Sequence, residues 1–408
     1  MKKKNEGIMK TSKIKLSLAS CIVVLAFIIA TLAAALCAAA PVLVANAATD
    51  FKGIGKAAYL MDYGTGTVIY ARNENERLPI ASMVKIMTAM LTLEAVERGD
   101  VTLDDDVTIS ENSASMGGSQ VFLDAHTTHK LKDLLRTVIV ASANDSCVAL
   151  AEHIEGSVEA FVAKMNMRAK ELGMENTVFK NCTGLPAAEA FSCAKDAATM
   201  FSQLIKYPVY FDYAKVWLED YEHPDGRKTT ITNTNKLVRF YDGCDGGKTG
   251  YTSEAKFCLT ATAKRKDMRV IAVMIGADSS KVRNAAVSSM FDYAFANYSN
   301  EILLKAGEDI ENTVEVLGGK QNTIRLTVEK DVSQFMSRQE GGSYELKYEL
   351  PTAVKAPVQY GDVVGKVYLV KDGVVVTETN VIANETVQRM SLFDAIGIIG
   401  KQWSTQAK

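Results

Sequence analysis

Residues 57–90 read AAYLMDYGTGTVIYARNENERLPIASMVKIMTAM, and this stretch contains two kinds of secondary structure in succession. Its first half alternates between apolar and polar residues and breaks at a GTG turn, which predicts a β-hairpin over residues 57–71. Pro79 then precedes an apolar run that predicts a helix to about Arg98, where a glycine ends it. A hairpin followed directly by an apolar helix indicates a domain in which helices pack on a sheet.

The mixed pattern continues to about residue 298. Helical periodicity is followed by strand signals and then by another helical segment, at residues 131–154, 158–172, 250–262, 269–275 and 282–297. Strands on both sides of a helical block predict a single α+β domain over residues 48–298.

The character of the chain changes after Ala306. Short alternating runs with turns between them, such as TIRLTVEKDV and GVVVTETNVI, predict a small all-β domain over residues 299–385. The remaining residues, 386–408, predict an amphipathic helix. Its apolar stripe consists of Leu392, Ile396, Ile399 and Trp403. With its basic flanks this helix is a candidate membrane anchor, and capping of the β domain is the open alternative.

The N-terminus predicts export. Six lysines precede residue 16, and no charged residue occurs from Leu16 to Thr49. Ala45-Asn46-Ala47 has the small-x-small pattern of a cleavage site, so residues 1–47 are interpreted as a signal peptide. The apolar run is also long enough to stay in the bilayer uncleaved. Either outcome places the rest of the protein outside the cytoplasmic membrane.

Composition excludes several classes of protein. The formal net charge is −2, whereas nucleic-acid binders are usually basic, so no nucleic-acid partner is expected. The five cysteines beyond the signal form no CxxC pair and are interpreted mostly as buried thiols, with a chance disulfide left open. His126 and His129 lack a third ligand at a metal-site spacing, so we interpret them as parts of a surface loop and expect no metal or cofactor.

The helix that begins near Pro79 contains a serine and a lysine on one face. Ser82 and Lys85 are three positions apart, so their side chains can meet. Burial among apolar neighbours would lower the lysine pKa and make it a base for the serine hydroxyl. A helix-start serine beside an extended surface lysine is the ordinary alternative. The chain contains four SxxK matches, beginning at Ser12, Ser82, Ser192 and Ser253.

Two further motifs distinguish the match at Ser82. Ser142-Ala143-Asn144 follows an apolar run in the helical block, although Ser110-Glu111-Asn112 shows that SxN also occurs by chance. Lys248-Thr249-Gly250 opens a predicted strand, where a cation and a hydroxyl could bind a carboxylate while a peptide approaches the strand edge. A phosphate loop is excluded, because Asp242 replaces the first glycine that this motif requires.

SxxK, SxN and KTG in this order, in an exported α+β chain, form a specific combination. With the segments DLLRTVIVASANDSCVALAEHI and GGKTGYTSEAKFCLTATA, nearly the whole mature chain resembles the low-molecular-weight penicillin-binding proteins, the serine D-alanyl-D-alanine carboxypeptidases of the penicillin-binding protein 5 type. The resemblance implies an antiparallel sheet flanked by helices, a helical subdomain and a second, all-β domain.

The resemblance also implies a role for each motif residue. Ser82 would be the acylated nucleophile, Lys85 its base, Ser142 a proton relay to the leaving group, and Asn144 a ligand of the substrate amide. The substrate carboxylate would bind Lys248, Thr249 and Arg283, next to Gly250. Backbone N–H groups of Ser82 and Tyr251 would form the oxyanion hole. For Arg283, a solvated charge at the start of a helix is an equal alternative.

Three positions depart from the pattern of the resembled family. Ala125-His126 replaces a frequent Gly-Glu or Gly-Asp, Lys256 replaces a frequent glycine, and Cys193 replaces a common threonine. None of these is a catalytic side chain, so we expect them to affect loop shape and rate more than the reaction.

The activity implied by the resemblance is removal of the terminal D-alanine from peptidoglycan stem peptides, with β-lactams as inhibitors. A membrane surface is the further expected partner, through the terminal helix or an uncleaved signal. A serine β-lactamase is one alternative, with Glu189 as its candidate deacylating residue. A non-catalytic cell-wall-binding protein is the other.

Overall fold

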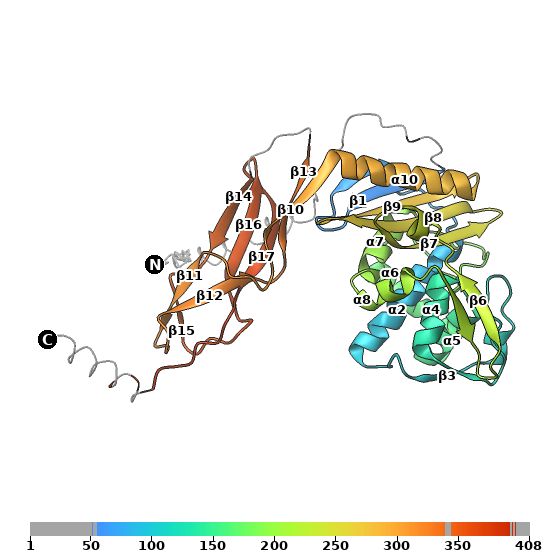
Figure 1. The fold of residues 1–408 in the computed structure, drawn as a ribbon, viewed down its shortest axis with the longest axis horizontal. Helices are drawn as coiled ribbons and strands as arrows, with labels where there is room; N and C mark the ends of the chain where they lie inside the picture. The colour runs from blue at the N-terminus through green and yellow to red at the C-terminus, as the bar shows by residue number, and fades with distance from the viewer. Residues whose placement is uncertain (1–50, 52–54, 339–343, 392–393, 395, 397–408) are drawn as a thin grey trace, which may run out of the picture. The chain divides into compact units, whose positions relative to one another are not determined.

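The computed structural model describes residues 51, 55–338, 344–391, 394 and 396 (Figure 1). The predicted signal peptide and most of the predicted C-terminal helix lie outside these residues. Among the described residues, none of the helices combines the length and apolar character needed to cross a bilayer.

A five-stranded antiparallel sheet forms the centre of the first part of the chain. Its strands, in spatial order, are β2 (Val68–Arg72), β1 (Ala57–Asp62), β9 (Met268–Ala277), β8 (Lys256–Arg265) and β7 (Cys244–Thr252). The predicted hairpin is confirmed as β1 and β2, which pair next to each other. Strand β7 lies at the edge of the sheet, so one of its sides has no strand partner within the described part of the chain.

Helices cover both faces of this sheet (Figure 1). On one face, α10 (Ser280–Asn297) packs on β8 and β9; on the other lie α7 (Ala194–Leu204) and the helical block. Alternate residues of β1 point to opposite faces, as a pleated strand requires. Ala58 and Leu60 join the core beneath α10, whereas Ala57 and Tyr59 join the core of the helical block.

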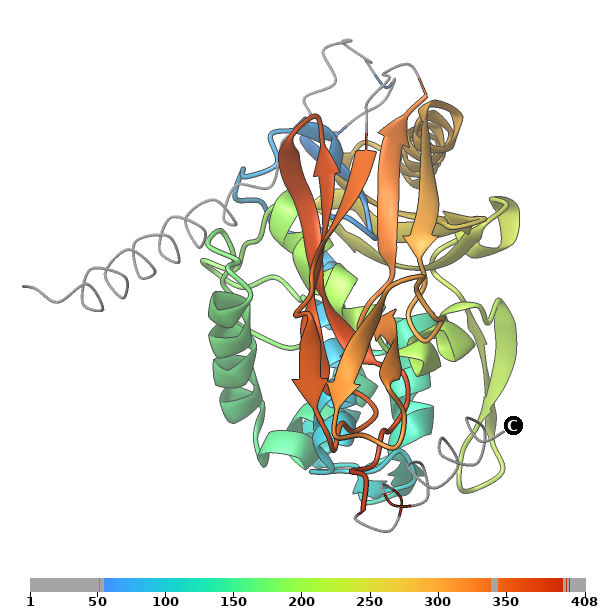
Figure 2. The same ribbon diagram turned by 90° about the vertical axis from the view of Figure 1, so that its left-hand side faces the viewer.

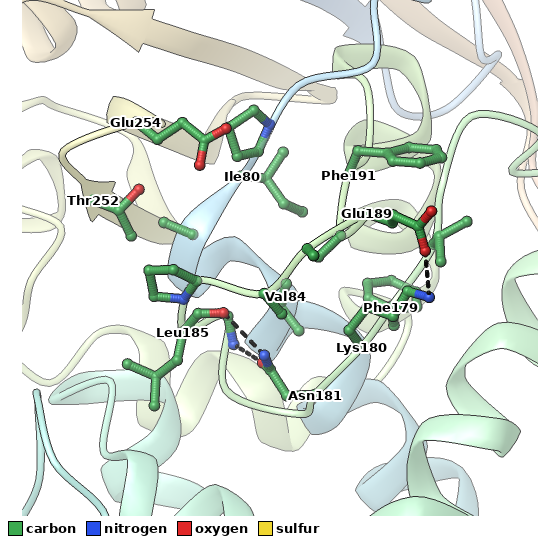
Figure 3. A pocket seen from close by; sticks show the side chains of 18 residues that line it. Ile80, Val84, Phe179, Lys180, Asn181, Leu185, Glu189, Phe191, Thr252 and Glu254 are labelled. Carbon is green, nitrogen blue, oxygen red and sulfur yellow. Dashed lines mark hydrogen bonds and ion pairs between the residues drawn. The ribbon is translucent and has the colours of Figure 1, made fainter.

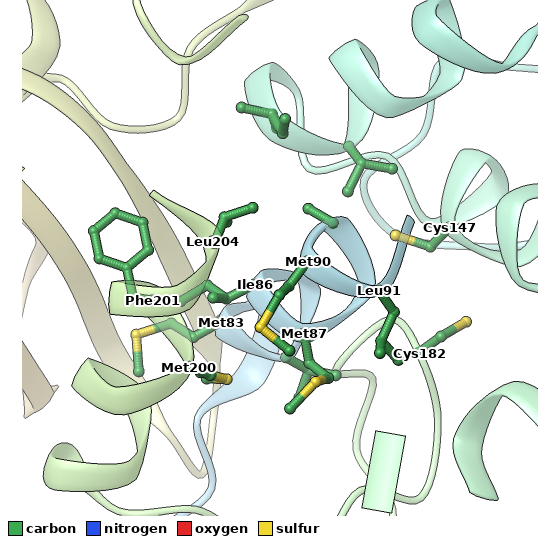
Figure 4. Close-up of a cluster of buried hydrophobic side chains, with 14 of the residues drawn as sticks. Met83, Ile86, Met87, Met90, Leu91, Cys147, Cys182, Met200, Phe201 and Leu204 are labelled. Carbon is green, nitrogen blue, oxygen red and sulfur yellow. The ribbon is translucent and has the colours of Figure 1, made fainter. Parts of the chain in front are cut away.

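The helical block contains the segment with Ser82. Its elements are the short 3-10 helix η1 (Ala81–Val84), α2 (Lys85–Arg98), α3 (Glu111–Ala114), α4 (Leu131–Val140), α5 (Asn144–Glu155), α6 (Val158–Glu171) and α8 (Pro208–Ala214). The short helix α9 (Leu237–Phe240) contacts β7, and its Leu237 joins the core beneath α10. As predicted, α2 ends at Gly99, which has a left-handed conformation. Most of α2 is buried, and Figure 4 shows Met87 and Met90 gathered with Met200 and Phe201 of α7.

The structure differs from two predictions about elements. The helix predicted over residues 131–154 is interrupted after Val140, so α4 and α5 are separate helices. The strand predicted over residues 250–262 is two strands, β7 and β8, with a turn between them, and Lys248 lies inside β7 instead of opening it. The sequence reading also omitted two hairpins, β3 (Asp106–Thr108) with β4 (Thr128–Lys130) and β5 (Leu218–Glu222) with β6 (Lys228–Thr232).

The second part of the chain is all β, as predicted, with its own core. Its six-stranded sheet has the order β14 (Tyr344–Glu349), β16 (Val363–Lys371), β17 (Val374–Ala383), β12 (Thr323–Val328), β11 (Thr313–Leu317) and β15 (Ala353–Lys355). Figure 2 shows these strands in orange and red. A separate pair, β10 (Tyr298–Leu304) and β13 (Val332–Ser337), completes this region. Residues 387 and 389 form isolated bridges to it, in the stretch where the terminal helix was expected.

Candidate active site

Backbone from two other segments packs against the turn that carries Ser82. A Cβ atom on Gly250 of β7 would lie 2.5 Å from the carbonyl oxygen of Ile80, and one on Gly184 would lie 2.1 Å from that of Ala81. Only glycine allows such close approach. Ala81 itself has a φ of +48°, which is uncommon for a residue with a side chain. The neighbouring segments therefore fix the position of the serine by direct backbone contact.

Lys85 is the buried partner of this serine. Its Nζ lies 3.1 Å from Ser82 Oγ, 2.6 Å from Asn144 Oδ1 and 2.6 Å from the carbonyl oxygen of Thr183. Burial lowers the pKa of Lys85 below its ordinary value of 10.5, and nearby thiols and the Asp145 carboxylate oppose this shift. The cause of the lowered pKa is the loss of hydration of the charged form.

The three contacts of Lys85 suit a neutral amine. The amide oxygen of Asn144 and the carbonyl oxygen of Thr183 accept hydrogen bonds but cannot donate, so they take the two N–H groups of the amine. The Ser82 hydroxyl, which accepts a hydrogen bond from Lys85 Nζ when the lysine is an ammonium ion, can instead donate to the lone pair of the neutral amine. In this state the amine is placed to accept the hydroxyl proton of Ser82.

Ser142 occupies the break between α4 and α5. Its φ is +64°, its side chain is 3% exposed, and its Oγ has no hydrogen-bond partner among the described residues. A buried hydroxyl without a protein partner and an uncommon backbone conformation both cost free energy, and both are frequent at functional sites. Ser142 therefore lies at the break between the two helices, with a buried hydroxyl that no described group binds.

Asn144 is the first residue of α5 and orients the lysine. Its Oδ1 accepts from Lys85, and its Nδ2 donates to the carbonyl oxygen of Gly117 at 2.7 Å. Its backbone N–H donates to the carbonyl oxygen of Ser119. Since a carboxamide has two acceptor sites and two N–H donors, each end of the side chain keeps capacity for a further partner.

The KTG residues lie in the edge strand β7, next to the turn that carries Ser82. Lys248 is 4% exposed and donates to the carbonyl oxygen of Thr249 at 2.9 Å. Burial lowers the pKa of Lys248 well below 10.5, and the positive charges of Lys85 and Arg283 lower it further. Cationic neighbours disfavour the charged form of Lys248, and a bound carboxylate would favour it.

Arg283 is buried, so the alternative of a solvated helix-start charge is wrong. Its guanidinium donates to the carbonyl oxygen of Cys258 at 3.3 Å and to Asn284 Oδ1 at 3.0 and 2.8 Å. Burial lowers the pKa of Arg283 to about 10. These bonds fix the guanidinium behind β8, within electrostatic range of Lys248.

Tyr251 differs from the other residues of the predicted site because its side chain is exposed. The ring is 57% exposed and lies on Phe257, with 4.5 Å between the ring centroids. Thr249, by comparison, is 8% exposed. The side chain of Tyr251 therefore lies at the rim of the site, and its predicted role involves only the backbone N–H.

The other described copies of the motifs lack this environment. Ser192 is buried against Thr177 Oγ1, and the lysine three residues later is exposed. Ser253 and its lysine are both exposed in the β7–β8 turn. Ser110 of the second SxN match caps α3 and donates to Glu152. Among the described copies, only the Ser82 match places a buried amine next to its serine.

Sequence reasoning missed the residues that support the site. The carbonyl of Thr183 is presented by a turn in which Asn181 Oδ1 accepts from the N–H groups of Thr183 and Gly184. The NCTG stretch carries the signal of such a turn. Asp145 is buried and accepts backbone N–H groups of Val121, Leu123 and Ser146. An acidic residue in the first turn of a helix gives no indication of that contact.

The three departures from the family pattern occupy special positions. Lys256 and His126 have φ values of +57° and +65°, in the left-handed region that glycine tolerates best. The thiol of Cys193 caps α7 by accepting from the N–H of Asp196 at 3.4 Å. None of the three takes part in a contact with the motif side chains.

The predictions for cysteine and histidine are confirmed in part. The five cysteines of the described chain are buried and free. His126 is exposed, as expected of a surface loop. His129 is not: it is buried on β4 and lies 2.6 Å from the hydroxyl of Tyr221.

A sheet covered by helices, with a serine and a buried lysine beside an edge strand that carries KTG, defines the class of serine acyl-transfer enzymes to which penicillin-binding proteins and serine β-lactamases belong. Within that class the assignment is specific. Residues 45–279 match the family described as D-alanyl-D-alanine carboxypeptidase, and residues 298–389 match the C-terminal domain of penicillin-binding protein 5. The chain belongs to the D-alanyl-D-alanine carboxypeptidase family, and it is a serine-type hydrolase.

Similar proteins agree with this assignment. The D-alanyl-D-alanine carboxypeptidase DacF of Bacillus subtilis is 44% identical over 337 residues, which cover 82% of this chain and 86% of DacF. A crystal structure of penicillin-binding protein 5 from Haemophilus influenzae has a TM-score of 0.67 and 31% identity, covering 84% of this chain and 100% of its own. The Streptomyces K15 DD-transpeptidase has a TM-score of 0.56 and 28% identity, covering 60% of this chain and 98% of its own.

Proposed function

We propose that this D-alanyl-D-alanine carboxypeptidase removes the terminal D-alanine from peptidoglycan stem pentapeptides through an acyl-enzyme on Ser82. The observation that carries the proposal is the environment of Lys85, a buried amine with two fixed acceptors and a serine hydroxyl as its third contact. This arrangement supplies a base at the place where the serine requires one.

Acylation begins when Ser82 Oγ attacks the carbonyl carbon of the penultimate D-alanine. The hydroxyl proton passes to Lys85 Nζ as the C–O bond forms. The N–H groups of Ser82 and Tyr251 would stabilise the oxyanion, which is where positioned donors contribute most to the rate. The close approach of Gly250 to the Ser82 turn supports this pairing of the two N–H groups, because a Cβ there would lie 3.2 Å from the Ser82 nitrogen.

Collapse of the tetrahedral intermediate breaks the C–N bond to the terminal D-alanine. Ser142 would relay to the leaving nitrogen the proton that Lys85 took from Ser82, which returns Lys85 to the neutral amine and leaves the Ser142 hydroxyl intact. The buried Ser142 hydroxyl, which has no hydrogen-bond partner among the described residues, is suited to this relay. Lys248, Thr249 and Arg283 would hold the terminal carboxylate during this step. Water then attacks the ester, loses a proton to Lys85 and releases the shortened peptide, which restores the Ser82 hydroxyl.

β-Lactams would acylate Ser82 in the same way, and the resulting acyl-enzyme ester would be hydrolysed slowly. The serine β-lactamase alternative requires a second base for rapid deacylation. Its candidate, Glu189, pairs with Lys180 at 3.4 Å and its side chain is 81% exposed. That placement does not favour activation of a water at the ester. A cell-wall-binding protein without catalysis would have no need of the buried amine.

The remaining proposals concern the domains and the location of the enzyme. We assign catalysis to residues 48–298, a supporting role to the β domain of residues 299–385, and membrane attachment to residues 386–408 or to an uncleaved signal. The enzyme would then act at the outer face of the cell membrane or in the cell wall. The charge-free N-terminal run and the amphipathic C-terminal stripe support this location.

Release of D-alanine from a pentapeptide substrate tests the proposed reaction. The wild-type enzyme should release D-alanine, and Ser82→Ala should lose at least about 10³-fold in rate, the order found when a nucleophile is removed from such a site. Equal release by both proteins would refute the assignment of Ser82. Rapid turnover of a chromogenic cephalosporin would favour the β-lactamase instead.

A further inference from the structure

A pair of buried histidines has no role in the mechanism above. His129 of β4 is 6% exposed, and His223, at the start of the turn between β5 and β6, is 3% exposed. Their rings meet edge to face with 6.1 Å between the centroids. Charges on both rings at this distance would repel each other, so the packing favours neutral histidines.

The hydrogen bonds of His223 assign its ring proton. Thr229 Oγ1 donates to the carbonyl oxygen of Val121 at 3.4 Å, so it accepts from His223 Nε2 at 2.8 Å. Nδ1 is then left without a proton and accepts from the guanidinium of Arg227 at 3.3 Å. A second proton would go to Nδ1, which faces a group that has no acceptor. Protonation of His223 would therefore break the contact with Arg227 and set two cations against each other.

His129 can take up a proton at lower cost. Thr127 Oγ1 donates to the carbonyl oxygen of Asp124 at 2.6 Å, so it accepts from His129 Nε2 at 3.0 Å. Nδ1 lies 2.6 Å from the hydroxyl of Tyr221. Because a hydroxyl both donates and accepts, it can turn to accept from a protonated Nδ1. His223 is therefore the acid-sensitive member of the pair.

The charges around the pair come from the β5–β6 hairpin, the facing loop, α4 and α5. They belong to Arg227, Asp225, Asp124, Asp133 and Asp145. Burial and then Arg227 lower the pKa of His223 below its ordinary value of 6.5, and the acidic groups oppose this shift. The unfolded chain therefore binds the proton more tightly, so the stability that neutral His223 provides is complete above pH 6.5 and falls as the pH drops below it.

The hairpin turn with His223 holds a loop of residues 117–124, called the site loop below. Arg227 donates to the carbonyl oxygen of Phe122 at 2.9 Å and to Asp124 Oδ2 at 2.5 Å. The bond from Thr229 to Val121 described above reaches the same loop. Loss of the contact between His223 and Arg227 would therefore loosen the attachment of the site loop to the hairpin.

The site loop supports Asn144 from its other end. The carbonyl oxygens of Gly117 and Ser119 accept from the Asn144 side chain and from its backbone N–H. A Cβ on Gly118 would lie 2.9 Å from Asn144 Nδ2 and 3.7 Å from Leu185 Cδ2. Figure 3 shows Leu185 at the wall of the cavity of about 350 Å³ beside the serine turn. The site loop thus connects the hairpin turn to the carboxamide that orients the catalytic lysine.

We propose that His223 and Arg227 position Asn144 by holding the site loop, and that uptake of a proton by His223 releases this loop and lowers the activity of the enzyme in acid. The effect on activity rests on the proposed function, in which Asn144 orients Lys85, whereas release of the loop does not. His223 and Arg227 touch no reacting atom in this account and are positioning residues.

The first test measures the rate of acylation by penicillin from pH 5 to 8 in full-length wild type and His223→Asn. The asparagine Oδ1 can replace Nδ1 as the acceptor for Arg227 but cannot take up a proton. Lys85 and Asp145 are present in both proteins, so their titration cancels in the ratio of the two rates. Relative to His223→Asn, wild type should lose roughly tenfold between pH 8 and pH 5, at the low end of what a hydrogen bond to a charged group contributes. His126→Asn, which changes an exposed histidine, should follow the wild-type profile.

A ratio that stays constant with pH overturns the proposal, and a His126→Asn profile like that of His223→Asn overturns the assignment to His223. Hydrogen exchange in wild type follows the loop directly and requires neither the variants nor catalysis. After correction for intrinsic rates, the N–H groups of Val121 and Leu123 should lose protection between pH 8 and pH 5 relative to those of α6. Unchanged protection also overturns the proposal. Wild type that reacts with no penicillin at any pH would instead contradict the proposed function.

Discussion

Lys85 brings an amine into the buried first part of α2, where the neighbouring residues Ile86, Met87 and Thr88 carry no charge. Burying an ammonium ion costs several kcal/mol even after the protein relaxes around it. The neutral amine avoids most of that cost, and Asn144 and Thr183 satisfy its two N–H groups. The neutral form is also the one that can accept a proton from Ser82. Stability and catalysis therefore favour the same protonation state.

The lowered pKa of Lys85 predicts how acylation depends on pH. Below that pKa the side chain is an ammonium ion and cannot accept the Ser82 proton, so the acylation rate by a β-lactam should rise with pH and level off before the ordinary value of 10.5 is reached. Stopped-flow measurement of acylation from pH 5 to 10 gives the midpoint. Lys85→Arg should be slower by about 10²- to 10⁴-fold. A wild-type rate independent of pH would contradict a base at this position.

Lys248 is required for substrate binding in this account, but its buried charge should lower the free energy of unfolding. Since burial and neighbouring cations lower its pKa well below 10.5, the unfolded chain binds this proton more tightly than the folded protein does. Lys248→Met should therefore raise the free energy of unfolding at pH 7, by about 1–4 kcal/mol, and abolish D-alanine release. The gain should shrink as pH approaches 10.5. A lower melting temperature of the variant at pH 7 would show that the ammonium is stabilised by its surroundings.

The sequence was informative about the site where contacts are local. Helical spacing placed Ser82 next to Lys85. The presence of the SxN and KTG motifs distinguished this pair from the other SxxK matches. The carbonyl of Thr183 was not predictable, because it lies 98 positions from Lys85 and carries no side-chain signal. The burial of Arg283 likewise depends on packing behind β8, which spacing does not reveal.

At the scale of elements, the site depends on how closely β7 approaches the turn before α2. In Gly250→Ala the new Cβ would lie 2.5 Å from the Ile80 carbonyl oxygen, so the strand or the turn must move. Because displacements of about 1 Å can cost about 100-fold in rate, we expect acylation by penicillin to slow by at least that factor. Mass spectrometry over time measures it.

A second glycine provides the control for that experiment. Gly99 ends α2 with a φ of +78°, and a Cβ there would meet no atom within 4 Å. Gly99→Ala should cost about 1–2 kcal/mol of stability through backbone strain and leave the acylation rate unchanged. If both variants acylate at the wild-type rate, the close approach of β7 has no catalytic role.

Elements with a strong local pattern were predictable, and elements shaped by the site were not. The β1–β2 hairpin follows from apolar–polar alternation, and α6 follows from helical periodicity. The break between α4 and α5 was missed because the apolar periodicity runs through it, while Ser142 adopts a conformation that its sequence neighbours do not signal. β7 and β8 were joined because Lys256, instead of glycine, follows the turn.

At the scale of the whole molecule, the six-stranded sheet of the β domain has a core separate from those of the catalytic region, and Phe335 of β13 joins the core beneath α10. The match to the Streptomyces K15 DD-transpeptidase covers 60% of this chain and 98% of the transpeptidase, so a similar fold exists in a shorter protein. A chain ending at residue 298 should therefore acylate with penicillin at the wild-type rate. Some stability should be lost, because Phe335 stacks on Tyr298 at 5.1 Å. A truncated chain that melts cooperatively but does not react would contradict an independent catalytic domain.

The central claim is that Ser82 is the acylated residue, and the most direct test is mass spectrometry after incubation with penicillin. The wild-type protein should gain one penicilloyl group, and peptide mapping should place it on Ser82. Ser82→Ala should gain none, whereas Ser253→Ala, which removes the serine of another SxxK copy, should react like wild type. An adduct on a different residue, or equal labelling of Ser82→Ala, would contradict the account.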